Sequence, residues 1–158
     1  GWVLENGALT GNDNPNADPE ILVAIGELAT SIGAADITEI EFITTAFDVS
    51  NGGTLQVRVR FNEAVDVTGT PQLTVVNDSR ANHTLSYASG TGSNELVFSL
   101  TIAAGGGGVI AADDELSIGA NATALNGGTI KDAGTNTAST ITNAAGVGTA
   151  AGTITAVA

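Results

Sequence analysis

The clearest pattern in the chain is an alternation of apolar and polar residues between positions 55 and 61. The seven residues are, in order, Leu55, Gln56, Val57, Arg58, Val59, Arg60 and Phe61. A period of two places successive side chains on opposite faces of a β-strand. The sequence therefore predicts a strand whose apolar side chains point into a core and whose two arginines point outward.

Similar short segments recur along the chain, separated by turns rich in Gly, Asn and Thr. We expect strands at 37–42, 71–76, 84–88, 95–101, 115–118, 128–130 and 153–157. The segment ASGTGSNE between two of these strands predicts a hairpin loop, and the glycine run 105–108 predicts a flexible connector. Short strands with frequent turn signals predict an all-β fold, an antiparallel β-sandwich over residues 37–158.

The first 36 residues have a different character and predict an N-terminal arm with one short helix at 19–32. Asp18 is a good N-cap, Pro19 suits the first turn, and Gly33 stands where a helix would end. Apolar residues at helical spacing lie between these signals, namely Ile21, Leu22, Ile25, Leu28 and Ile32. The run ILVAI equally suits a buried strand, so that alternative stays open.

Apolar residues at the start of the arm predict a protein interface. Residues 1–17 show no apolar period, yet they include Trp2, Val3 and Leu4. A large ring at an extended terminus packs on its own domain or on a neighbouring subunit. Packing on the chain's own domain is the commoner case, but residues 1–36 have no place in the predicted sandwich. We therefore expect Trp2, Val3 and Leu4 to contact a protein partner, and we expect a homo-oligomer.

The charge balance restricts the partners. Seventeen acidic residues against four basic ones give a net charge of −13, and residues 1–50 contain no Lys or Arg. Nucleic acid and anionic lipid are poor partners for such a chain, because phosphate binding needs clustered Lys or Arg. No apolar run reaches the roughly 18 residues of a membrane span, so we expect no membrane insertion.

Candidate chemistry is sparse, and we expect no catalytic residues. His83 is the only histidine and no cysteine is present. We therefore expect no catalytic dyad or triad based on histidine, and no histidine metal cluster, within one chain. We expect His83 to be an ordinary surface residue. The carboxylate pairs Glu39 with Glu41 and 113–115 are the nearest approach to a glycosidase pair, but both suit solvent-facing strands or turns.

Calcium is the one cofactor that the sequence suggests. Hard oxygen ligands gather in one loop, at Asn12, Asp13, Asn14, Asn16, Asp18 and Glu20. Ca²⁺ prefers such ligands, and Asp113, Asp114 and Glu115 form a second acidic cluster. Neither cluster has EF-hand spacing, and a plain Asn/Asp turn followed by a helix cap is the favoured interpretation of the first.

The segment FNEAVDVTGTPQLTV (61–75) resembles the bacterial immunoglobulin-like repeats of large surface adhesins. The resemblance continues through YASGTGSNELVFSL and ANATALNGGTIKDAGTN. Similar domains occur on tailed-phage virions as decoration, tail or fibre modules. The resemblance implies an immunoglobulin-like sandwich that binds proteins rather than catalysing a reaction.

Three departures from the repeats shape the expected function. The first 36 residues have no counterpart, GGGGVIAADDE replaces the usual acidic-glycine turn, and the chain holds one unit. We expect a phage virion surface protein of the capsid decoration or cement kind, which binds an assembled lattice through its arm. A bacterial cell-surface adhesin module, extracellular and used for attachment, is the alternative. A calcium-stabilised carbohydrate-binding module is the third hypothesis.

Overall fold

A computed structural model describes residues 2–3, 21–23 and 33–158. The chain divides into two units, residues 1–30 and 31–158. The first unit contains one antiparallel strand pair among its described residues, β1 (Trp2–Val3) with β2 (Ile21–Val23). We call residues 1–30 the arm unit and residues 31–158 the body.

The predicted helix at 19–32 is wrong at residues 21–23, where the chain is a strand. Trp2 lies opposite Val23 and Val3 lies opposite Ile21 in the β1–β2 pair. The β-branched side chains of Ile21 and Val23 favour strands over helices, and pairing with β1 reinforces that preference. At residues 21–23 the structure therefore agrees with the alternative interpretation of the run ILVAI as a strand. Residues 19–20 and 24–32 lie outside the described part of the chain.

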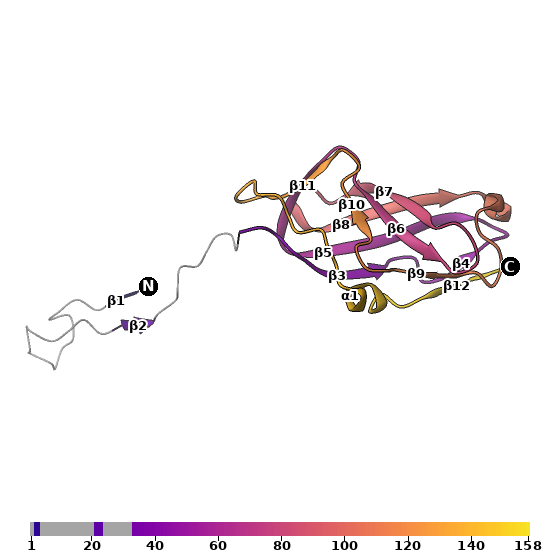
Figure 1. The fold of residues 1–158 in the computed structure, drawn as a ribbon, viewed down its shortest axis with the longest axis horizontal. Helices are drawn as coiled ribbons and strands as arrows, with labels where there is room; N and C mark the ends of the chain where they lie inside the picture. The colour runs from indigo at the N-terminus through magenta and orange to yellow at the C-terminus, as the bar shows by residue number, and fades with distance from the viewer. Residues whose placement is uncertain (1, 4–20, 24–32) are drawn as a thin grey trace, which may run out of the picture. The chain divides into compact units, whose positions relative to one another are not determined.

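The body is built mainly from β-strands, which confirms the all-β prediction (Figure 1). Its strands are β3 (Ile37–Phe42), β4 (Phe47–Asp48), β5 (Gly53–Thr68), β6 (Gln72–Asn77), β7 (His83–Ser89), β8 (Ser93–Ile102), β9 (Glu115–Ser117), β10 (Thr123–Ala124), β11 (Thr129–Asp132) and β12 (Ile154–Val157). Two short helical turns, η1 (Ala104–Gly108) and α1 (Ala145–Thr149), complete the described elements.

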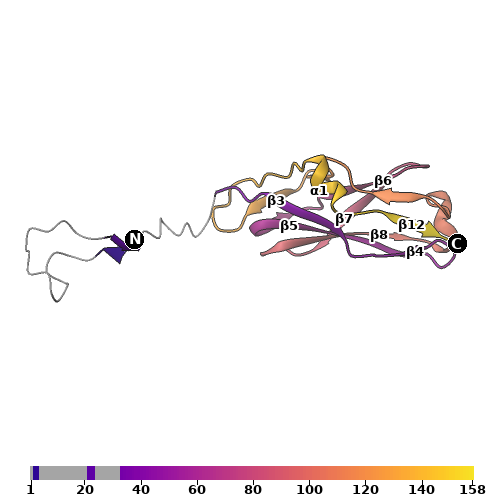
Figure 2. The same cartoon turned by 90° about the horizontal axis from the view of Figure 1, so that it is seen from below.

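The strands of the body form one curled, mixed sheet. Its order is β11-β5-β8-β7-β6-β9-β12-β4, with β3 also paired to β5 and β10 to β6. Strand β4 precedes β5 in the chain yet pairs with β12 at the far end of this order, so the sheet curls back on itself (Figures 1 and 2). The β4–β12 pair is parallel, which the antiparallel prediction did not foresee.

The predicted alternation along β5 is confirmed. Leu55, Val57 and Val59 are fully buried and Phe61 is 1% exposed, whereas the intervening arginines face outward. Val57 lies opposite Phe98 of β8, so the two strands share one apolar face. Each large apolar side chain buried in this way contributes about 1.5 to 3 kcal/mol, so this face is central to the stability of the body.

The glycine run at 105–108 is a defined turn instead of the expected flexible connector. All four glycines have positive φ, between 54° and 76°, a region that residues with a Cβ rarely adopt. Gly105 N–H donates to the carbonyl of Val49 at 2.8 Å. Gly106 is buried, and a Cβ there would lie 2.9 Å from Val49 and 3.2 Å from Ile110. Glycine is required at 106 by both conformation and space.

Candidate functional site

Charged side chains form a ladder across the outward face of β3, β5 and β8. Arg58 and Arg60 extend from β5, with Glu39 and Glu41 of β3 on one side and Glu95 of β8 on the other. The strand register sets this arrangement, because Glu39 and Glu95 both lie opposite Arg60, and Glu41 lies opposite Arg58. We call these five residues the Arg–Glu ladder.

Every charged group of the ladder has a partner of opposite charge. Arg58 bonds to Glu41 through Nε at 2.5 Å and also through Nη2, and to Glu95 through Nη1 at 3.2 Å. Arg60 donates from Nη1 to Glu39 and from Nη2 to Glu95, both at 2.7 Å, and from Nε to Glu95 at 3.0 Å. Its hydrogen bond to Glu95 raises the pKa of Arg60 and lowers that of Glu95.

The ladder is open to solvent, so its effect on stability is small. The five side chains are between 33% and 46% exposed. Water and salt screen ion pairs at such positions. The ion pairs therefore hold the five side chains in place on the outward face of the sheet but add little to the stability of the fold.

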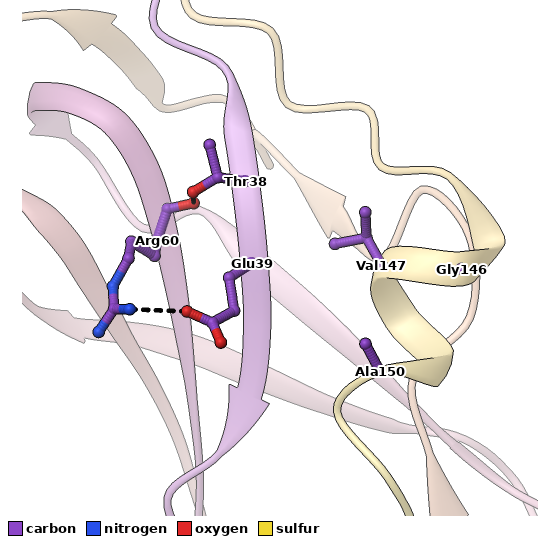
Figure 3. Close-up of a pocket in the computed structure, with 6 residues that line it drawn as sticks. All are labelled: Thr38, Glu39, Arg60, Gly146, Val147 and Ala150. Carbon is purple, nitrogen blue, oxygen red and sulfur yellow. Dashed lines mark hydrogen bonds and ion pairs between the residues drawn. The ribbon is translucent and has the colours of Figure 1, made fainter.

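An open cleft of about 520 Å³ adjoins the ladder between α1 and the strands β3 and β5 (Figure 3). Its lining residues are Thr38, Glu39, Arg60, Gly146, Val147 and Ala150. The charged groups in this wall already bond to each other, and Thr38 donates from its hydroxyl to the carbonyl of Arg60 at 3.2 Å. The wall therefore combines an ion-paired charged side, from Glu39 and Arg60, with an apolar side, from Val147 and Ala150.

A second polar cluster is buried where β6, β7 and the turn before β9 meet. Asn77 donates from Nδ2 to Asp114 Oδ2 at 3.0 Å, and the same nitrogen lies 3.3 Å from His83 Nε2. Asp114 Oδ2 also accepts from the Ala111 amide and pairs with Arg80 Nε, each at 3.0 Å. The prediction that His83 is an ordinary surface residue is wrong, since it is only 4% exposed.

Burial and hydrogen bonding shift both titratable groups of this cluster. Burial lowers the pKa of His83, opposed by the nearby charge of Asp114. The hydrogen bond from Asn77 is the main cause that lowers the pKa of Asp114. A neutral His83 and an ionised Asp114 therefore coexist near neutral pH, and the cluster serves to hold the β6–β7 turn against the strand β9.

The second acidic cluster predicted at 113–115 is split by the fold. Asp114 points into the buried cluster, while Asp113 and Glu115 are exposed. Within residues 33–158, and in the two short arm strands, no three His, Cys, Asp or Glu side chains are placed to hold a metal ion. The fold thus gives Asp114 a role in the hydrogen-bond network rather than in a cluster of three ligands.

The remaining predicted site residues belong to the arm unit. Trp2 and Val3 form β1, whereas Leu4 lies outside the described residues. The calcium candidates Asp13, Asn14, Asn16, Asp18 and Glu20 also lie outside them. Sequence reasoning missed the Asn77–His83–Asp114 cluster, although the alternation of His83, Leu85 and Tyr87 along β7 was a signal that His83 faces the core.

No family model matches the chain, and neither the curated proteins nor the solved structures contain a match. In the part of the chain that the structure describes, no helix has the length and apolar character needed to cross a membrane.

Proposed function

We propose that this chain is a non-enzymatic structural protein with an immunoglobulin-like sandwich. The pairing order supports this assignment. The run β3-β5-β8-β7 corresponds to the A-B-E-D sheet of immunoglobulin domains, and β6-β9-β12 corresponds to C-F-G. The hydrogen bonds between β6 and β7 join these two sets of strands into the single curled sheet.

The observation that carries the functional proposal is the arm unit with its own strand pair. Residues 1–30 form a unit distinct from the body, and β1 pairs with β2 inside it. A two-stranded pair is marginally stable by itself in water, so it gains most from docking on another surface. We assign that surface to a neighbouring copy or to the protein lattice that the copies coat, with Trp2, Val3 and Leu4 as contact residues.

The partner is a protein surface on a virion, such as the capsid of a tailed phage. Arg58, Arg60 and Arg80 are all ion-paired with carboxylates, and Lys131 lies opposite Asp66 in the β5–β11 register. With three of the four basic residues ion-paired in this way and a net charge of −13, the chain favours neutral or basic protein partners over nucleic acid.

A bacterial surface adhesin module is the second candidate, and the path of the chain through the body favours it. The segment that leads into β3 lies at one end of the body, and the last strand β12 reaches the opposite end (Figures 1 and 2). Entry and exit at opposite ends suit modules that follow one another in a row. Such a row would attach cells through many copies in one polypeptide.

The gene neighbourhood distinguishes the two candidates. A capsid or portal gene next to this reading frame is expected for a virion decoration protein. Dozens of tandem copies of the body in one reading frame would contradict that proposal and support the adhesin module. Mass spectrometry of purified virions then tests whether the chain is present on the particle.

A further inference from the structure

The chain contains three Asn-Gly pairs, and the structure describes two of them in identical NGGT segments. These segments are Asn51 to Thr54 and Asn126 to Thr129, and the third pair, at residues 6–7, lies outside the described residues. We propose that Asn126 is a site of spontaneous deamidation and that the fold protects Asn51 from the same reaction. The two segments share one local sequence, so any difference between their rates comes from the fold.

The reaction needs only the chain and water. The backbone nitrogen of the following glycine attacks Cγ of the asparagine side chain and forms a new C–N bond. The bond from Cγ to Nδ2 breaks, and Nδ2 leaves as ammonia after taking up the glycine amide proton. Water then opens the cyclic imide at either carbonyl, which gives aspartate or isoaspartate. The imide nitrogen has no hydrogen, so the glycine must give up any hydrogen bond that its N–H donates.

At Asn126 the fold offers little resistance to ring formation. Asn126 and Gly127 have φ values of 46° and 76°, and Gly128 N–H donates to the Leu125 carbonyl at 2.8 Å, which defines a type I′ turn. Both central residues are exposed. Among the hydrogen bonds of the described residues, none is donated by Gly127 N–H, and apart from Gly127 and its two chain neighbours no described atom lies within 4 Å of a Cβ built on Gly127. Among the described residues, the Asn126 side chain has one hydrogen bond, from Nδ2 to the Thr70 carbonyl at 3.1 Å.

At Asn51 the same reaction would break several interactions. Gly52 N–H donates to the Asp48 carbonyl at 3.0 Å, a bond that the imide cannot make. Asn51 Nδ2 donates to Asp48 Oδ2 at 2.6 Å, and Asp48 Oδ1 accepts from the Ser50 hydroxyl, also at 2.6 Å. The hydrogen bond from Ser50 is the largest cause that lowers the pKa of Asp48, and the bonds from Asn51 add to it, so Asp48 is charged at neutral pH. We call the hydrogen bonds of the Asp48 carboxylate to Ser50 and Asn51 the clamp. A Cβ on Gly52 would lie 2.5 Å from the Ala104 nitrogen, so the Gly52 backbone packs closely against the chain at 102–104.

The product would change the molecule at a defined place. Deamidation adds one negative charge to a chain of net charge −13, and isoaspartate inserts an extra backbone carbon into the turn between β10 and β11. The type I′ geometry depends on positive φ at both central residues, which an isoaspartyl residue does not reproduce. Aged protein should therefore contain a more acidic form that is altered at this turn.

Peptide mapping of the full chain tests the proposal. Native protein and protein unfolded in urea are incubated at mildly alkaline pH and digested with trypsin under mildly acidic conditions. Fragment-ion sequencing then shows which asparagine carries the small mass gain that results when the side-chain NH2 group is replaced by OH. Cleavage after Arg58, Arg80 and Lys131 places Asn51 and Asn126 in different peptides. We expect both sites to react at similar rates in urea, and Asn126 to react at least tenfold faster than Asn51 in the native chain.

A variant tests the protecting clamp separately. Asp48→Ala removes the side-chain bonds to Asn51 and should speed deamidation at Asn51 in protein whose circular dichroism is still native, with Asn126 unchanged. If the variant unfolds, the comparison of native and urea-treated wild-type protein still decides the question. Equal native rates at the two sites, or faster reaction at Asn51, would overturn the proposal.

Discussion

Asn77 and His83 lie in contact inside the body, with Nδ2 of Asn77 3.3 Å from Nε2 of His83. The amide nitrogen of asparagine is only a donor, so the hydrogen bond requires Nε2 of His83 to be the unprotonated nitrogen. Because Nδ2 of Asn77 also donates to Asp114, one amide joins a neutral imidazole to a carboxylate. This geometry assigns the ring proton of neutral His83 to Nδ1.

The first prediction is that the body loses stability as the pH falls from about 7 to about 5. Burial lowers the pKa of folded His83 below the ordinary 6.5. The unfolded chain therefore binds a proton in this window that the folded chain does not, and unfolding becomes easier as pH falls. The carboxyls with lowered pKa, Asp48, Asp114 and Glu95, act in the same direction but from ordinary values of 3.8, 3.8 and 4.5. Melting temperature by circular dichroism measures the effect.

His83→Gln is the matched variant for this test, because its side chain keeps an acceptor but does not titrate. Its melting temperature should be nearly constant from about pH 7 to about pH 5, whatever its absolute value. A wild-type melting temperature that is equally constant over this range would show that His83 does not titrate as the structure implies.

The second prediction concerns the register of β5. Val59 is fully buried opposite Leu96, so Val59→Asp places a charge where no partner exists and should unfold the body. The expected cost of several kcal/mol is comparable to a total stability of about 5 to 15 kcal/mol. The control is Ser86→Asp on β7, where the residue is exposed and the change should stay within about 0.5 kcal/mol. Wild-type melting of Val59→Asp would disprove the register.

The third prediction separates conformation from packing in the glycine turn of η1. Gly106 and Gly107 both have positive φ, at 73° and 54°, so alanine at either position costs about 1 to 2 kcal/mol. Only at Gly106 would the new Cβ contact Val49 at 2.9 Å, while Gly107 has open space. Crowding of that kind costs roughly 1 to 3 kcal/mol more. The free energy of unfolding in urea should be clearly lower for Gly106→Ala than for Gly107→Ala. Equal free energies would show that the turn relaxes to make room for the new Cβ.

The strands of the body were predictable because local alternation determines which face is buried. Residues 55–61 alternate without interruption between apolar and polar side chains, and in β5 their apolar side chains are buried as predicted. The curled order of the sheet was not predictable, because β4 has two residues and its pairing with β12 depends on the path of the whole chain. The same limit applies at residues 21–23, where pairing with β1 outweighs a helical spacing of apolar residues.

The buried cluster shows why site residues are harder to predict than strands. Asn77 and His83 lie close in sequence, but Asp114 reaches them only because β6 pairs with β9. Spacing along the chain therefore gives no sign that these three residues meet. By contrast, the Arg–Glu ladder follows from alternation along β3, β5 and β8 once the strands are paired, although the pairing itself comes from the fold.

The central claim is that the arm unit causes assembly while the body folds independently. The most direct test is sedimentation velocity of the full chain, of residues 31–158 alone, and of the full chain with Trp2→Ala, with circular dichroism as the control for folding. We expect the full chain to sediment as an oligomer, residues 31–158 to be a folded monomer, and Trp2→Ala to weaken the oligomer. A monomeric full chain at every concentration, or an unchanged oligomer formed by residues 31–158, would contradict the claim.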